Sequence, residues 1–288
     1  MASSHLSVDS LPNEILINVL SSFDTRSLLP LAAVCHRFRG LVGRVHYARL
    51  IEATVLKDHE VILECYHPCD KLSTPSLFCE YLGTDGLSEA GDVANLGQLN
   101  SLYARFRPYL GDGQKRQRNR GPPSAMIQKT EEPAIEPPTH EVHLESGELF
   151  SQLCTVTDMV KVGPRRGLFL SIANVTDGVI RVWRDWLQKE AEKTAKASKT
   201  QQRARTSMDD ILWTDSSKNV GLKFRVTKDE SLREPVLFAS DEDPPVSYSL
   251  EYQELFIRTN QLRLSYETSE AQQQENHTGK AIVIASSM

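Results

Sequence analysis

The chain has 288 residues, a formal net charge of −5 at pH 7 and a pI near 5.9. This length accommodates a small module and one larger domain with a sizeable core, and the acidic balance does not provide the basic footprint of a nucleic-acid-binding protein. No run approaches the ~18 consecutive apolar residues of a membrane span, and the first ten residues lack the apolar core of a signal peptide. We therefore expect a cytoplasmic or nuclear protein with no specific nucleic-acid or membrane partner, whose five irregularly spaced cysteines are reduced.

The first predicted helix follows Leu11. Pro12 suits the first helical turn because its missing N–H has no bond to lose, and Glu14 adds a carboxylate near the positive end of the helix. Apolar residues then recur at helical spacing, namely Ile15, Leu16, Val19 and Leu20.

Two further helical stretches are predicted before residue 44. Asp24 is a candidate cap for a short turn that carries Leu28 and Leu29, and Gly43 is the expected end of the third stretch. The apolar positions of that third stretch are Leu31, Val34, Cys35, Phe38, Leu41 and Val42. A segment this small buries too little surface to be stable alone, so these stripes must pack on another domain or another chain.

The order Leu11-Pro12-x-Glu14-Ile15-Leu16, then Leu28-Leu29, then Leu31-x-x-Val34-Cys35-x-x-Phe38-x-x-Leu41 resembles the F-box. This family docks substrate receptors on the Skp adaptor of cullin-based ubiquitin ligases, and it often has Trp where Phe38 stands. The resemblance implies an F-box at residues 5–48. It also implies that adaptor contacts and the module's own core are drawn from the following set, without separating the two roles: Leu11, Pro12, Glu14, Ile15, Leu16, Val19, Leu28, Leu29, Leu31, Val34, Cys35, Phe38 and Leu41. The alternative is an ordinary helical hairpin packed on the rest of this chain.

After the module the apolar period changes from 3.6 to 2, most clearly at Val220, Leu222, Phe224 and Val226. Other strands are expected at 61–66, 77–82, 153–162, 167–175, 236–239, 246–258, 262–266 and 280–285. Many short strands separated by turn residues favour a mainly antiparallel sandwich of two sheets. We therefore predict an α+β protein, in which a three-helix F-box precedes a β-sandwich-like domain at residues 49–288 with one inserted helix.

The inserted helix is predicted from a helical face, which the helix formers QKEAEKTAKA continue. Its members are Val179, Val182, Trp183, Trp186 and Leu187. A hairpin through Asp177-Gly178 is the alternative. Residues 111–139 combine Gly, Pro and charge with few apolar residues, which predicts a disordered insertion, and 196–209 and 267–279 are expected to be flexible. The basic run 115–120 suits either nuclear import or a solvated loop.

Few residues point to catalysis or to a metal. Cys65, His67, Cys69 and Cys79 offer soft ligands, but they lack the paired spacing of structural zinc sites. His140 and His143 lack the four-residue spacing that places two histidine ligands on one helical face. We find no phosphate-binding Gly-rich loop and no nucleophile elbow. The expectation is a non-enzymatic protein without a cofactor or metal.

Aromatic residues suggest a recognition surface in the second domain. Exposed rings are good platforms for sugars or peptide side chains, although core packing is their commoner use; the candidates are Trp183, Trp186, Trp213, Tyr248, Tyr252 and Tyr266. Because loops at one end of a sandwich often bind partners, Trp213, Asp215 and Lys218 are the candidate target-binding residues. The stretches ECYHPCDKL, LFCEYLGTDGL and RVWRDWL resemble uncharacterised F-box proteins of filamentous fungi.

The resemblance to the F-box family implies a non-catalytic substrate receptor. Its partners are then the Skp adaptor, through it the cullin and RING subunits, and a protein target marked for proteasomal degradation. One alternative is an intracellular lectin-like or other ligand-binding protein that uses the F-box without a degradative role. Another is an enzyme fused to an F-box.

Overall fold

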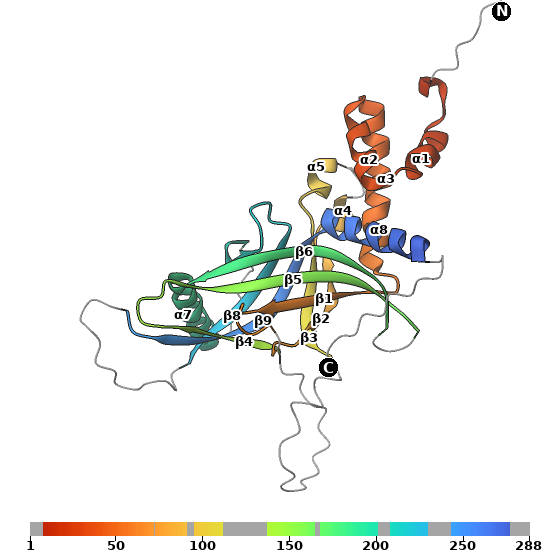
Figure 1. Ribbon diagram of the computed structural model, residues 1–288. Helices are drawn as coiled ribbons and strands as arrows, with labels where there is room; N and C mark the ends of the chain where they lie inside the picture. The colour runs from red at the N-terminus through yellow and green to blue at the C-terminus, as the bar shows by residue number, and fades with distance from the viewer. Residues whose placement is uncertain are drawn as a thin grey trace, which may run out of the picture.

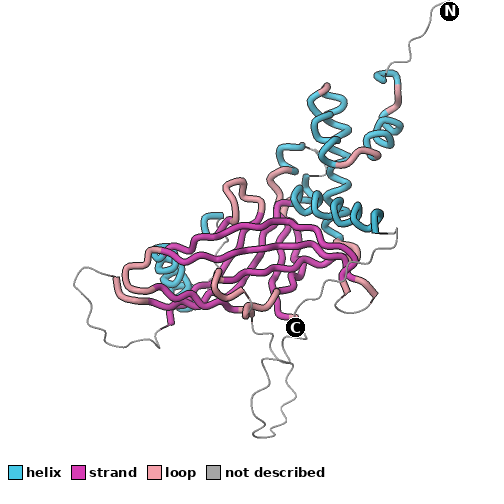
Figure 2. Tube along the Cα trace, in the orientation of Figure 1, coloured by secondary structure: helices cyan, strands magenta, loops and turns pink. Residues whose placement is uncertain are grey.

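The computed structural model describes residues 8–71, 73–90, 95–111, 137–164, 168–200, 208–229 and 243–276. It places a helical N-terminal module beside a strongly curved β-sheet, which two long helices cover (Figures 1 and 2). The predicted α+β class with mainly antiparallel strands is confirmed. Within the described residues, no helix has the length and apolarity to cross a membrane.

The helical module contains three α-helices and two 3-10 turns: η1 (Val8–Ser10), α1 (Asn13–Ser21), α2 (Thr25–Leu28), η2 (Leu29–Ala33) and α3 (His36–Val55). Gly43 does not end the third helix, as we had expected, but lies buried inside α3. A glycine within a helix costs only about 1 kcal/mol, which burial of Val45, Leu50 and Ala53 outweighs. The helix ends instead at Leu56, whose backbone is left-handed.

In the described part of the chain, nine strands form one antiparallel sheet: β1 (His59–Tyr66), β2 (Leu77–Thr84), β3 (Tyr103–Leu110), β4 (Thr139–Leu144), β5 (Phe150–Val162), β6 (Phe169–Trp183), β7 (Ile211–Trp213), β8 (Val220–Asp229) and β9 (Val246–Arg258). Their order is β6-β5-β1-β2-β3-β9-β8-β7, and β4 also pairs with β9. The sheet is continuous, so the two separate sheets of the expected sandwich are not formed. The reason is the length of β9, which pairs with β3 and β4 in succession along one edge and with β8 along the other.

The curved sheet brings its two outermost strands together and encloses one core. A Cβ atom added at Gly178 in β6 would lie 3.1 Å from the carbonyl oxygen of Thr214, which directly follows β7. Buried side chains from every long strand fill the interior, Leu63, Phe106, Leu153 and Leu250 among them. The domain is therefore a filled, barrel-like body.

The inserted helix begins later than expected. Residues 179–183 belong to β6, which pairs with β5 from Phe169 to Trp183, and α7 follows at Arg184–Thr200. The branched residues Val179, Ile180 and Val182 suit the pleated strand, where they complete an existing ladder. Gly178 lies within the strand, so the alternative hairpin is also wrong.

The C-terminal element α8 (Thr259–Asn276) is a helix where we expected a strand at 262–266 and a flexible segment at 267–279. Leu262 and Tyr266 are four residues apart, and both are buried in the sheet domain's core. Shorter elements are α4 (Leu87–Ala90), α5 (Leu96–Leu99) and η3 (Met208–Asp210). The expected strands at 236–239 and 280–285, the run 115–120 and residues 112–136 of the expected insertion lie outside the described residues.

Candidate functional site

The helical module has a core of its own. Buried aliphatic side chains from α1, α2, η2 and α3 form this core: Leu16, Leu20, Leu28, Ala32, Leu41, Val42 and Val45. Half-buried residues of the module pack against it: Leu11, Ile17, Leu29, Leu31 and Phe38. The predicted residues Leu16, Leu28 and Leu41 are therefore structural, and they are unavailable to a partner.

A second set of predicted apolar residues faces solvent. Ile15 is 46% exposed, Val19 is 49% exposed and Val34 is 65% exposed. Pro12 and Glu14 are exposed as well. Pro12, Ile15 and Val19 follow one another at three- and four-residue spacing, which places them on one side of α1. We call Pro12, Ile15 and Val19 the apolar stripe of the module; Val34 is an exposed apolar residue outside α1.

Short polar contacts hold the helices of the module. The Asp24 carboxylate accepts a hydrogen bond from Ser27 N at 3.1 Å and caps α2, and the bonds from Ser27 lower the pKa of Asp24. The predicted partner residue Cys35 is exposed and caps α3 by accepting from Phe38 N. Arg37 donates from Nε to Asn13 Oδ1 at 2.9 Å and from Nη2 to the Leu11 carbonyl at 2.5 Å. It thereby ties the start of α3 to the start of α1.

A family model described as F-box-like matches residues 8–50. This segment is an F-box-like domain. F-box domains are typically non-catalytic adaptor modules that bind Skp. The match spans η1, α1, α2, η2 and the greater part of α3, together with the core of the module and its apolar stripe. No curated protein and no solved structure matches the chain.

The F-box-like domain is joined to the sheet domain by a partly buried polar network centred on Glu267 of α8. The Glu267 carboxylate accepts from Thr25 N at 3.1 Å and from Thr25 Oγ1 at 2.6 Å. It also pairs with Arg263 at 2.9 Å and with Arg49 at 3.6 Å. Because these partners come from α2, α3 and α8, one carboxylate fixes three helices relative to one another.

Further contacts of α8 extend this junction in both directions. His46 Nε2 of α3 donates to Asn260 Oδ1 at 2.8 Å, and Arg263 pairs with Glu52 at 2.9 Å. On the sheet side, Ser269 Oγ lies 2.9 Å from His59 Nε2 of β1. Sequence reasoning missed this junction, although Arg263 and Glu267 are an i, i+4 pair of opposite charge that indicates a helix.

The candidate target-binding loop between β7 and β8 is tightly held. The Trp213 and Tyr103 ring centroids are 5.4 Å apart, and Lys218 Nζ lies 5.9 Å from the Trp213 ring centroid. The Asp215 carboxylate accepts from the backbone and side-chain nitrogens of Asn219, both at 3.0 Å. Trp213 at the end of β7 and Asp215 and Lys218 in the loop that follows thus lie in one well-held segment, and their role in binding remains a prediction.

The other aromatic candidates do not converge on one site. Tyr248, Tyr252 and Tyr266 are buried in the core, against which Trp186 also packs. Trp183 by contrast is 47% exposed on the outer face of β6.

The cysteine and histidine candidates are also dispersed. Cys65 and Cys79 are buried core residues, and burial raises the pKa of the Cys65 thiol to about 11, whereas Cys69 is exposed. Burial lowers the pKa of His140. Among the described residues, no three His, Cys, Asp or Glu side chains are arranged to hold a metal ion.

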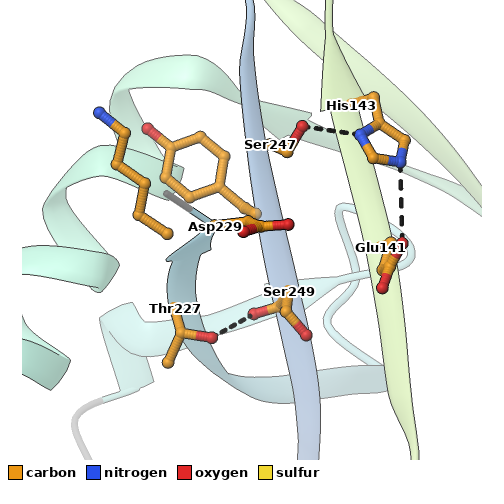
Figure 3. Close-up of a pocket in the computed structure, with 8 residues that line it drawn as sticks. Glu141, His143, Thr227, Asp229, Ser247 and Ser249 are labelled. Atoms are coloured by element: carbon orange, nitrogen blue, oxygen red, sulfur yellow. Dashed lines mark hydrogen bonds and ion pairs between the residues drawn. The ribbon is translucent and has the colours of Figure 1, made fainter. Parts of the chain in front are cut away.

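A polar groove of about 260 Å³ lies on the outer side of β4, β8 and β9 (Figure 3). Its lining includes Ser247, whose Oγ is 2.7 Å from His143 Nδ1, and Glu141, whose carboxylate is 3.8 Å from His143 Nε2. A nucleophilic serine also needs N–H donors aimed at the developing oxyanion. Ser247 instead lies within a ladder, opposite His143 on one strand and Asp229 on the other, which favours a polar surface over a catalytic centre.

Proposed function

We propose that the F-box-like domain docks on the Skp adaptor, and that the sheet domain presents a protein target to a cullin-based ubiquitin ligase. In this assembly the chain performs no chemistry. It raises the concentration of target lysines near the ubiquitin-carrying enzyme that the cullin and RING subunits bring.

The observation that supports adaptor binding is that the apolar residues of the F-box-like domain fall into two sets, one buried in its core and one exposed to solvent. Its core is complete without the apolar stripe, because Leu16 is 3% exposed while its neighbour Ile15 is 46% exposed. A contiguous exposed apolar surface on a soluble protein marks an interaction site. Each stripe residue removed from water by a partner adds stability in proportion to its buried area.

The proposal can be tested with the double variant Ile15→Asp/Val19→Asp in the full chain. Charges on the stripe should weaken binding to the purified Skp adaptor by more than about tenfold, because they would be desolvated in an apolar interface. Val55→Asp is the matched control, since Val55 is 68% exposed on α3 but lies beyond residues 8–50. Equal adaptor affinity for the double variant and the control, with both proteins folded, would contradict the proposal.

A further inference from the structure

The outer face of β6 carries an exposed patch of apolar and aromatic residues around one cation. We call Leu149, Phe150, Val179, Arg181 and Trp183 the distal surface. The register places Phe150 opposite Trp183 and puts Val179, Arg181 and Trp183 at alternate positions of β6. Because alternate strand residues point to the same side, these three share one face.

The exposed area of this surface is unusual for its residue types. Leu149 is 63% exposed, Val179 is 51% exposed and Trp183 is 47% exposed. The intervening residues Ile180 and Val182 are buried in the core, so the fold needs the inward side of β6 but not the outward side. The ring centroids of Phe150 and Trp183 lie 5.0 Å apart and form a joint platform. Tryptophan and arginine are the residue types that most often dominate binding energy at protein interfaces.

Arg181 is the charged residue within the distal surface, and the nearest acidic residue along β6, Asp177, lies before Val179 at the edge of the surface. The Arg181 guanidinium lies 5.6 Å from the Phe150 ring centroid, and in the part of the chain that the structure describes it has no carboxylate partner. Another cation, Lys71, lies 5.6 Å from the ring centroid of Tyr66, which is two strands away from Val179 through Cys154. A partner that buries Arg181 must therefore supply a carboxylate along with its apolar contacts.

The end of β6 that leads into α7, where Trp183 stands, lies away from the F-box-like domain (Figure 1). Near its start, β6 is bound to α8, where Ile172 N donates to Gln272 Oε1 at 3.2 Å. Trp183 is eleven residues further along the strand, which corresponds to roughly 35 Å. A protein bound at the distal surface leaves the apolar stripe of the F-box-like domain free.

We infer that the distal surface is the docking site for the protein target, and that it binds a segment in which aromatic or aliphatic anchors stand next to Asp or Glu. The anchors pack on Trp183, Phe150 and Val179, and the acidic side chain pairs with Arg181 over the Phe150 ring. This inference rests on the proposed function, since it names the surface that recruits the target.

The test uses a phage-displayed library of short random peptides, selected on the immobilised full chain. Enriched peptides should combine apolar anchors with acidic residues. Synthetic copies should bind Trp183→Ala at least about tenfold more weakly than the unaltered chain. Arg181→Glu should reverse the charge preference, so that copies with Lys in place of Asp or Glu bind better than the acidic originals.

Lys228→Glu is the matched control, because it makes the same change in net charge at an exposed residue on β8. Adaptor binding is measured on every preparation. Failure to enrich peptides, or equal peptide binding by Trp183→Ala and Lys228→Glu, overturns the inference even when adaptor binding is intact. Loss of adaptor binding by Ile15→Asp/Val19→Asp tests the proposed function separately, so the two failures are distinguishable.

Discussion

At the scale of single residues, neighbours in one apolar run have opposite roles. Leu16 and Leu20 lie in the core of the F-box-like domain, whereas Ile15 and Val19 face solvent on the same helix. The exposed fraction, rather than the hydrophobicity, therefore decides which substitution affects folding and which affects binding. A polar residue at Leu20 should unfold the domain, while one at Val19 should leave it folded.

Two buried histidines near α8 predict a pH-dependent stability. Burial is the chief reason why the pKa values of His46 and His59 are lowered. The nearby cations Arg49 and Arg263 lower the pKa of His46 further, and Lys161 does the same for His59. The unfolded chain therefore binds protons more readily than the folded chain. Stability is fully present above the unfolded pKa of about 6.5 and is lost as pH falls through it, by up to about 1.4 kcal/mol per pH unit for each histidine.

Urea unfolding at several pH values between 5 and 8 provides the measurement, roughly bracketing the unfolded pKa. His46→Gln/His59→Gln should flatten the dependence in this window, because glutamine does not titrate. Identical pH profiles for the two proteins would show that other groups control acid stability.

At the scale of elements, α8 joins the F-box-like domain to the sheet domain. On one side, its residues Leu262 and Tyr266 pack into the core of the sheet domain. On the other side, its Glu267 accepts a hydrogen bond from Thr25 and forms an ion pair with Arg49 of the F-box-like domain, while Arg263 of the same helix also pairs with Glu267. The helix thus sets the direction in which the F-box-like domain projects from the barrel. The partly buried carboxylate of Glu267 is costly to neutralise, because Arg49 and Arg263 would lose their counter-charge.

Glu267→Gln should lower the free energy of unfolding by about 2 kcal/mol, less than for a fully buried pair because the side chain of Glu267 is 20% exposed. Hydrogen exchange should accelerate in α2 and α3, where the network ends. Glu192→Gln is the control, since Glu192 forms an exposed pair with Lys196 on α7 and should change stability by less than about 0.5 kcal/mol. Unchanged exchange in α2 and α3 would mean that packing alone fixes the junction.

At the scale of the whole molecule, β9 unites both parts of the sheet domain. The strands on either side of the predicted insertion, β3 and β4, both pair with β9. The segments before and after residues 111–139 therefore depend on each other for folding.

Cleavage of the chain between Lys115 and Arg120 should accordingly leave the two fragments associated. The N-terminal fragment contains the F-box-like domain and the strands β1 to β3. In the intact sheet β1 pairs with β5 and β3 pairs with β9, and both partner strands belong to the C-terminal fragment. Size-exclusion chromatography without denaturant should show a single complex that still binds the adaptor, and urea should separate the fragments. Separation under native conditions would indicate two independent domains.

Local patterns in the sequence were sufficient to predict the first two helices of the F-box-like domain and the strands β1, β2, β5, β8 and β9, but they did not predict β3, β4 or β7, or the bounds of α3. Pro12, Asp24 and the apolar spacing act within a few residues, and the alternation at Val220 to Val226 reflects one buried face of one strand. The sequence likewise predicted the F-box-like segment, because its motif lies within one continuous run.

Only the tertiary structure decided how these elements combine. Residues 262–266 are helical because Leu262 and Tyr266 meet a core built from distant strands, and 179–183 are a strand because β5 is there to pair with them. The apolar stripe, the Glu267 junction and the distal surface depend on which sides of α1, α8 and β6 are already occupied. Such occupancy arises from contacts between residues far apart in the chain, and local periodicity carries no information about those contacts.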